Sequence, residues 1–377
     1  MTTSRKAFLL CIITLSLLAL LTSTAMAHEE RSDGYFSFLD PEGNVFFQTA
    51  LRVSLGDEFI TENNKHYRVT QIEDDYAHCD YLGDIDLKPA TQEGLVQPAW
   101  QAAPDPSTRP VSNHRNPRVA IYHTHSDESY EPTDGTASIA GKGGILKVGS
   151  AFCSTLEKLG LEALHSTTPH DPHDAMAYNR SRRTAAELLR QNPAALFDLH
   201  RDAVPRELYA SKVHGQDVTK VTLVVGRENP KIKANLNFAQ QLKAINDEKN
   251  PGLIKGIFLA AGDYNQDLFD RAILLEVGSN ENSREAAQRG IALFANSIPQ
   301  AIGVSASPAP GQPQQATRRT GPWSALGWTL ALLIVAGAAY LYLSTGSLNE
   351  VKRKLHRFTK AEFSGFGDRK QRDNGDA

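Results

Sequence analysis

The central part of the chain, residues 117–303, alternates short apolar runs with longer segments in which apolar residues recur every three or four positions. The short runs predict strands at 119–123, 162–165, 195–199, 221–225, 257–260 and 273–276. The longer segments predict helices at 144–159, 174–190, 231–247 and 283–298. Strands that alternate with helices are typical of an α/β sandwich with a mostly parallel central sheet, and this is the fold class that we expect.

Residues 28–83 show a different pattern, in which short strand-like runs are separated by turn residues. The runs cover 35–39, 45–47, 51–53, 59–60 and 66–69. They predict a small β domain, which at about 55 residues would be marginally stable alone and is expected to dock on a neighbour. Proline-rich stretches at 84–116 and 304–322 predict linkers on either side of the central domain.

The two ends of the chain carry membrane-related signals. Residues 1–27 predict a signal peptide, because Arg5 and Lys6 precede an apolar run and the segment ends in a small-x-small cleavage pattern; an uncleaved anchor is the alternative. Residues 323–343 contain no charge and are long enough to cross a bilayer as one helix. The basic tail at 344–377 is then expected in the cytoplasm, which places the domain at 117–303 on the extracytoplasmic side of the cell membrane.

Charge and cysteine content exclude several classes of protein. The formal net charge of −3 gives no indication of nucleic-acid binding. The chain has three cysteines, of which Cys11 falls in the predicted signal peptide. Cys79 and Cys153 remain, either as one disulfide or as two unpaired thiols, so a disulfide framework and a cysteine-rich zinc site are both excluded.

Ionisable residues follow three of the predicted strands directly. The three segments are 121–128, 196–202 and 273–278. Ionisable groups that emerge from buried strands are costly unless they are paired or bind a metal. Since sites in such sheets lie at the carboxyl ends of strands, we expect these segments to meet.

The residue types in these segments match a catalytic zinc site. His125 and Glu128 supply two ligands across one tight turn, and His200 supplies a third from a neighbouring strand. Two histidines and a carboxylate form a common catalytic zinc set that leaves a fourth position for water. Glu276 is then free to act as the general base. The choice of Zn²⁺ rests on ligand type alone.

His123 is an alternative to His125, because both would point to the same face of an extended strand. We favour His125, which lies nearer the strand end. Asp198 or Asp202 could orient a ligand histidine from behind. The remaining histidines of the domain are interpreted as ordinary loop residues: His165, His170, His173 and His214. The sequence contains no His-Glu-x-x-His motif and no Gly-x-Ser-x-Gly motif.

At these strand ends the sequence resembles the stage II sporulation protein P family. The resemblance is carried by four motifs, which are His-Thr-His-x-x-Glu-Ser-Tyr at 123–130, Asp-Leu-His-Arg-Asp at 198–202, Tyr-Asn-Gln-Asp-Leu at 264–268 and Glu-Val-Gly at 276–278. It implies an amidase-like fold and a zinc-dependent N-acetylmuramoyl-L-alanine amidase that acts on peptidoglycan, with endopeptidase action on the stem peptides also credited to the family. A glycan-cleaving partner enzyme and a role in sporulation are implied as well.

Carried over to this chain, the resemblance implies that His125, Glu128 and His200 hold the metal and that Glu276 is catalytic. It also makes Arg201, Tyr264 and Asn265 candidate substrate-binding residues, although each could equally support the structure. Two alternatives stay open. One is a zinc metallopeptidase that cuts the stem peptides with the same ligands, and the other is a wall-binding module without catalysis.

Overall fold

The computed structural model describes residues 30–31, 33–87, 116–174 and 176–304. The predicted signal peptide, the predicted membrane helix at 323–343 and the basic tail lie outside these residues, as does most of each linker. Among the helices that the structure describes, none has both the length and the apolar character needed to cross a bilayer.

The predicted strands and helices of the central region are all present. The strands are β6 (Arg118–Tyr122), β7 (Glu162–His165), β8 (Ala195–Asp202), β11 (Val221–Gly226), β12 (Ile254–Ala260) and β13 (Ala272–Ser279). The main helices are α3 (Ile145–Lys158), α4 (Ala177–Leu189), α5 (Ile232–Lys249) and α6 (Arg284–Ala295). Short elements complete the region: α2 (Glu131–Asp134), α7 (Ile298–Ala301), η1 (Arg206–Leu208), η2 (Gln266–Leu268) and the hairpin of β9 (Ala210–Val213) and β10 (Gln216–Thr219).

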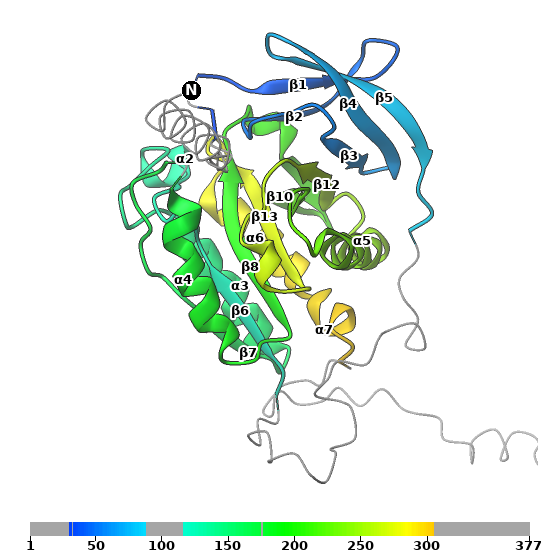
Figure 1. Ribbon diagram of the computed structural model, residues 1–377. Coiled ribbons are helices and arrows are strands. Elements are labelled where there is room, and N and C mark those ends of the chain that lie inside the picture. Colours follow the sequence, from blue (N-terminus) through cyan, green and yellow to red (C-terminus); the bar gives the residue numbers. More distant parts are fainter. Residues whose placement is uncertain (1–29, 32, 88–115, 175, 305–377) are drawn as a thin grey trace, which may run out of the picture. The chain divides into compact units, whose positions relative to one another are not determined.

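The N-terminal strands join the same sheet as the central strands (Figure 1). They are β1 (Phe36–Leu39), β2 (Val45–Thr49), β3 (Glu58–Thr61), β4 (Lys65–Glu73) and β5 (Tyr76–Asp84). The sheet has 11 strands in the order β2-β1-β5-β4-β3-β12-β11-β13-β8-β6-β7. Among its central strands only β11 and β13 pair antiparallel, so this part is mostly parallel as predicted.

The region predicted as a separate small β domain is continuous with the rest through β3, which pairs antiparallel with β12. Its backbone hydrogen bonds thus cover the edge that β12 would otherwise expose. The run at 51–53 is not a regular strand, and Leu51 forms only an isolated bridge with Glu30. Strand β5, which the sequence pattern did not predict, completes the hairpin with β4.

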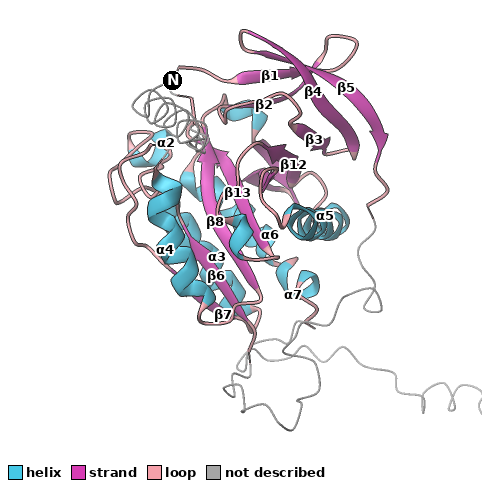
Figure 2. Cartoon of the chain, in the orientation of Figure 1, coloured by secondary structure: helices cyan, strands magenta, loops and turns pink. Residues whose placement is uncertain are grey.

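Helices cover both faces of the central strands (Figure 2). One face packs against α3, α5, α6 and α7 in the largest core cluster, which includes Ile121, Phe197 and Leu275. On the other face, Ala120, Tyr122 and Leu196 pack against α4. Farther along this second face, Val224, Phe258 and Leu274 pack against the aromatic side chains of the N-terminal strands. The N-terminal strands therefore cover the part of this second face that α4 leaves uncovered. Within the part of the chain that the structure describes, Cys79 and Cys153 are both unpaired.

Candidate metal centre

The first part of the site is the tight turn that follows β6. Residues 123–128 are all buried, and loop 137–145 holds their backbone in place. Gly143 N donates to Ser126 O over 2.9 Å, and Ile145 N donates to Glu128 O over 3.0 Å. A Cβ atom added at Gly143 would lie 2.2 Å from Glu128 O. Only glycine fits there, so the loop fixes the position from which Glu128 projects.

The Glu128 carboxylate is shared by two histidines. Its Oε1 lies 3.2 Å from His125 Nδ1 and 3.1 Å from His200 Nδ1. Its Oε2 accepts a hydrogen bond of 2.8 Å from the backbone N–H of Arg201. Two atoms that each lie about 2.0–2.1 Å from a tetrahedral zinc ion are roughly 3.3 Å apart. The distance from Glu128 Oε1 to each of the two imidazole nitrogens therefore fits a shared tetrahedral metal ion.

His200 and Glu276 come from neighbouring parallel strands. The two residues are direct partners in the register between β8 and β13, so their side chains lie on the same face of the sheet. His200 Nε2 lies 3.1 Å from Asp198 Oδ1, although the two atoms do not align as a hydrogen bond. Asp198 is itself fixed by Thr124, whose N–H donates to it over 2.8 Å. A carboxylate behind a histidine is the usual way to orient a metal ligand.

Glu276 is a buried carboxylate with one free oxygen. Its side chain is 2% exposed, and its Oε2 makes no hydrogen bond to any residue that the structure describes. Burial, with a smaller effect of the neighbouring carboxylates of Asp202 and Glu128, raises the pKa of Glu276 well above its usual range. An orphaned buried acid of this kind indicates a missing cation or substrate.

The protonation of the cluster suits a cation. Burial lowers the pKa of His125 to about 4, so this imidazole is neutral and able to ligate. Burial opposes charge on His200 as well, but Asp198 and Glu128 raise its pKa well above the usual value. In turn His200 and His125 hold the pKa of Glu128 well below its usual value against the effect of burial. The positive charge of protonated His200 thus offsets the negative charge of the Asp198 and Glu128 carboxylates, and a bound metal ion would supply that positive charge instead.

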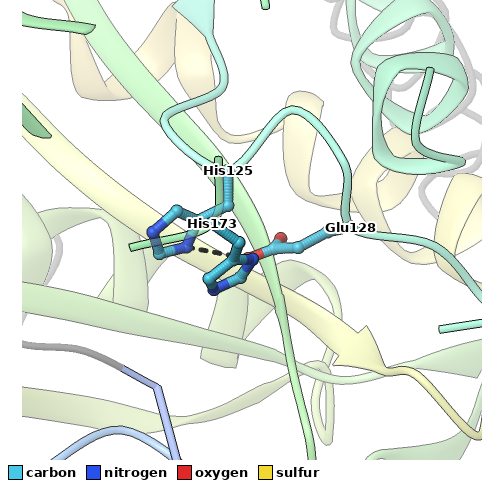
Figure 3. Close-up of side chains that lie close together, drawn as sticks. All are labelled: His125, Glu128 and His173. Atoms are coloured by element: carbon cyan, nitrogen blue, oxygen red, sulfur yellow. Dashed lines mark hydrogen bonds and ion pairs between the residues drawn. The ribbon is translucent and has the colours of Figure 1, made fainter. Parts of the chain in front are cut away.

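His173 is a third imidazole at the same place (Figure 3). His125, Glu128 and His173 each offer a ligand atom, and these atoms lie within 4.8 Å of one another. The ring of His173 stacks on His125 with centroids 3.7 Å apart, while its Nδ1 lies 3.2 Å from Asp127 Oδ1. The interpretation of His173 as an ordinary loop residue was therefore wrong. It belongs to the repeat Pro-His-Asp-Pro-His-Asp at 169–174, in the loop after β7, and the His-x-x-His spacing of that repeat was the signal that the sequence offered.

His123 does not face the cluster. Strand β6 ends at Tyr122, so the alternation that would have placed His123 beside His125 does not continue to these residues. The Nε2 of His123 lies 2.8 Å from His165 Nε2, and its Nδ1 lies 3.2 Å from the carbonyl oxygen of Leu199. Both ring nitrogens are thus occupied away from Glu128. The geometry favours His125 over His123 as the ligand.

The three candidate substrate-binding residues have different surroundings. Tyr264 is buried, donates from its hydroxyl to Ala261 O over 3.0 Å, and packs edge-on against Tyr178. The side-chain amide of Asn265 donates to Tyr178 O over 3.1 Å. Both side chains are thus engaged in supporting Tyr178, whose ring lies 5.6 Å from that of His125. Arg201, in contrast, lies at the cluster itself through its backbone contact with Glu128.

Comparison with known proteins gives one family. The sequence model described as stage II sporulation protein P matches residues 56–299. The stage II sporulation protein P of Bacillus subtilis (strain 168) is 33% identical over 190 residues, which cover 45% of this chain and 47% of that protein. The chain therefore spans about half the length of this curated relative.

Solved structures give weaker similarities. An N-acetylmuramoyl-L-alanine amidase from Clostridium difficile 630 aligns over 50% of this chain and 95% of its own, with 15% identity and a TM-score of 0.32. The CwlD amidase from Clostridioides difficile, solved in complex with the GerS lipoprotein, aligns over 50% and 96%, with 13% identity and a TM-score of 0.32. Similarities at this level carry no argument about the chemistry of the site.

Proposed function

The chain belongs to the stage II sporulation protein P family, and from this we propose that it is a peptidoglycan hydrolase with one zinc ion held by His125, Glu128 and His200. The bond that we assign to it is the amide between the N-acetylmuramoyl group and L-alanine. The observation that carries the proposal is the single Glu128 oxygen placed 3.1–3.2 Å from two imidazole nitrogens, with the orphaned Glu276 beside them.

His200 is preferred to His173 as the third ligand. Its Nδ1 faces the same Glu128 oxygen as His125 does, and Asp198 stands behind its other nitrogen. The Nδ1 of His173 already faces Asp127, and its Nε2 lies 3.7 Å from Glu30. Replacing His200 by alanine is expected to abolish stoichiometric zinc binding by the purified chain, whereas His173→Ala retains it. The opposite result would exchange their roles.

The residues of the chain supply the rest of the chemistry. Bound zinc would polarise the scissile carbonyl and lower the pKa of a water to about 7. Glu276 accepts the proton of the attacking water at Oε2 and passes it to the nitrogen of alanine as the carbon–nitrogen bond breaks. Asp198 keeps the His200 ring in its ligating orientation.

The experiment that tests this assignment compares wild type with Glu276→Ala. Purified full-length chains are loaded with zinc and incubated with peptidoglycan sacculi, and released stem peptides are quantified. We expect the variant to keep its zinc and its thermal unfolding temperature but to lose release of stem peptides. Wild-type turnover by the variant would overturn the role of Glu276 as the base.

We place this activity at the outer surface of the cell membrane. The support is the sequence pattern at 323–343 and the basic segment after it. A role in sporulation and cooperation with a glycan-cleaving enzyme are proposed from the family. Protease added to intact cells without a wall should remove the domain at 117–303 and leave the C-terminal tail protected. A protected domain would contradict this location.

A further inference from the structure

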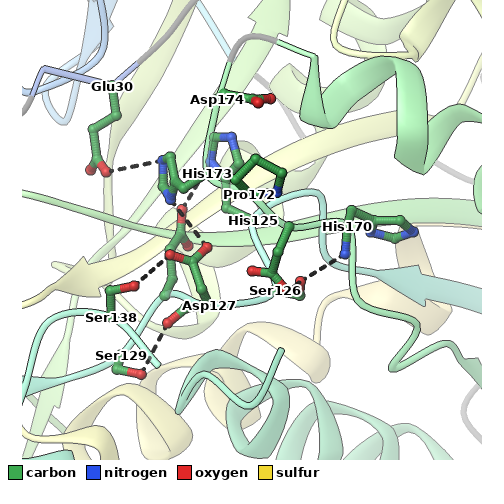
Figure 4. A network of polar contacts seen from close by, with 12 residues as sticks. Glu30, His125, Ser126, Asp127, Ser129, Ser138, His170, Pro172, His173 and Asp174 are labelled. Carbon is green, nitrogen blue, oxygen red and sulfur yellow. Dashed lines mark hydrogen bonds and ion pairs between the residues drawn. The ribbon is translucent and has the colours of Figure 1, made fainter. Parts of the chain in front are cut away.

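A further carboxylate, that of Glu30, lies at the metal centre, and it comes from the start of the described residues. Glu30 pairs with the Arg201 guanidinium, whose Nη1 lies 2.8 Å from Glu30 Oε1 and 3.0 Å from Oε2. Glu30 Oε2 also lies 3.7 Å from His173 Nε2 (Figure 4). A backbone bridge between Glu30 and Leu51 ties this segment to the N-terminal strands. Glu30 therefore reaches the site from 171 positions before Arg201.

Arg201 is held in place by hydrogen bonds from both its backbone and its guanidinium. Its backbone N–H donates to Glu128 Oε2, and its Nη2 donates to the carbonyl oxygen of Ala137 over 3.2 Å. The side chain is 5% exposed. A buried, always charged guanidinium fixed in this way is a preformed site for an anion.

Glu30 fills this anion site only in part. A carboxylate that fits a guanidinium well places its two oxygens on two different nitrogens. Both oxygens of Glu30 instead approach Nη1 alone, and the buried Nε of Arg201 makes no hydrogen bond among the described residues. The Nε–H points to the edge that it shares with Nη2, away from Nη1, so it is not the donor that a replacement for Glu30 would gain. A ligand carboxylate that placed one oxygen on Nη1 and the other on Nη2 would make two parallel hydrogen bonds and bind better than Glu30 does, and it would need the place that Glu30 occupies.

We propose that Arg201 forms a carboxylate-binding subsite beside the metal centre, that it receives an acidic group of the stem peptide, and that Glu30 occupies it until that group displaces the glutamate. This inference rests on the proposed function for the identity of the acidic ligand. The chemistry that it requires is a free carboxylate near the scissile amide. A peptide in which that carboxylate is replaced by an amide gains no binding affinity from the guanidinium.

Binding measurements on the full-length chain test the subsite without any turnover. The probe is acetylated alanyl-glutamyl-lysine with free carboxylates, and its counterpart carries amides in their place. Isothermal titration calorimetry is performed with wild type, Glu30→Gln and the matched control Asp33→Asn, which removes an acid from the same segment that pairs with Arg31 rather than Arg201. Arg201→Lys keeps the charge but removes the planar fork, and its unfolding temperature is recorded.

Removing the internal competitor is expected to lower the dissociation constant of the acidic peptide roughly fivefold in Glu30→Gln, because the ligand no longer has to displace Glu30. Asp33→Asn and the amidated peptide should show no such gain, and Arg201→Lys should weaken binding of the acidic peptide alone. Equal affinities in wild type and Glu30→Gln, or an equal gain for the amidated peptide, would overturn the subsite. A carboxylate-selective gain in a chain that releases nothing from sacculi would support the subsite while the proposed reaction fails.

Discussion

The contact between Gly143 and the Glu128 turn gives a test of the site that leaves its chemical groups untouched. In Gly143→Ala the added methyl group would lie 2.2 Å from Glu128 O, 2.5 Å from Asp127 C and 2.7 Å from Glu128 N. Cβ atoms essentially never approach heavy atoms closer than 3.0 Å. The neighbouring backbone must therefore move by about 0.8 Å, and Glu128 moves with it.

Two effects of known size follow from that displacement. Overpacking of a buried backbone contact costs about 1–3 kcal/mol of stability. Misplacement of a catalytic constellation by about 1 Å can reduce the rate by about 100-fold. We therefore expect Gly143→Ala to bind zinc more weakly and to release stem peptides about 100-fold more slowly, as measured on the folded fraction by chelator competition and by sacculus digestion.

Gly256→Ala is the matched control. A Cβ there would lie 2.5 Å from Ile60 O and 2.3 Å from the Phe59 ring, at the pairing of β3 with β12 rather than at the metal centre. Its unfolding temperature should fall by a comparable amount, while zinc affinity stays close to that of wild type. If Gly143→Ala kept wild-type zinc affinity and turnover, the claim that loop 137–145 positions Glu128 would be refuted.

Three further predictions concern the support of the site. Asp198→Asn should lower zinc affinity about 10- to 100-fold, because His200 loses the carboxylate behind its Nε2; an unchanged affinity in chelator competition would contradict this. Lys255 lies in β12, with its ammonium group 4.0 Å from the centroid of the Tyr209 ring, and burial lowers its pKa to about 8 from the 10.5 of a free lysine. Above pH 10.5, the pKa of Lys255 in the unfolded chain, the side chain is neutral in both states and its burial carries no charge penalty; the stability that this gives is lost as the pH falls through 8. The free energy of unfolding of wild type should therefore rise by up to about 3 kcal/mol relative to that of Lys255→Met between pH 7.5 and 10.5, as measured by denaturant titration. Parallel curves for the two proteins would refute that shift. Deleting residues 30–86 exposes the edge of β12 and should give aggregates in size-exclusion chromatography, whereas a monomeric, folded product would show that the N-terminal strands are dispensable.

The local pattern of apolar and ionisable residues was sufficient to predict the central strands and helices and the meeting of four candidate site residues. The apolar runs predicted the strands that carry His200 and Glu276, and the rule that sites lie at strand ends predicted their meeting with His125 and Glu128. His200 and Glu276 lie within strands that the apolar pattern predicted, and His125 and Glu128 lie in the turn that follows a predicted strand.

Contacts between segments that are far apart in sequence could not be predicted from local pattern. His173 lies in a loop, and its approach to His125 depends on the path of residues 166–174. The pairing of β3 with β12 joins segments far apart in sequence, and neither strand has a pattern that specifies its partner. The contact between Glu30 and Arg201 has the same origin, since it exists only because the N-terminal strands fold over the site.

The most direct test of the central claim is digestion of purified sacculi by the full-length chain, with and without a zinc chelator, followed by mass spectrometry of the products. The account predicts release of intact stem peptides that begin with a free alanine amine, their loss when the chelator is present, and their return when zinc is added back. Fragments cut within the stem would indicate a metallopeptidase instead. Wall binding without any released product from the zinc-loaded chain would contradict catalysis altogether.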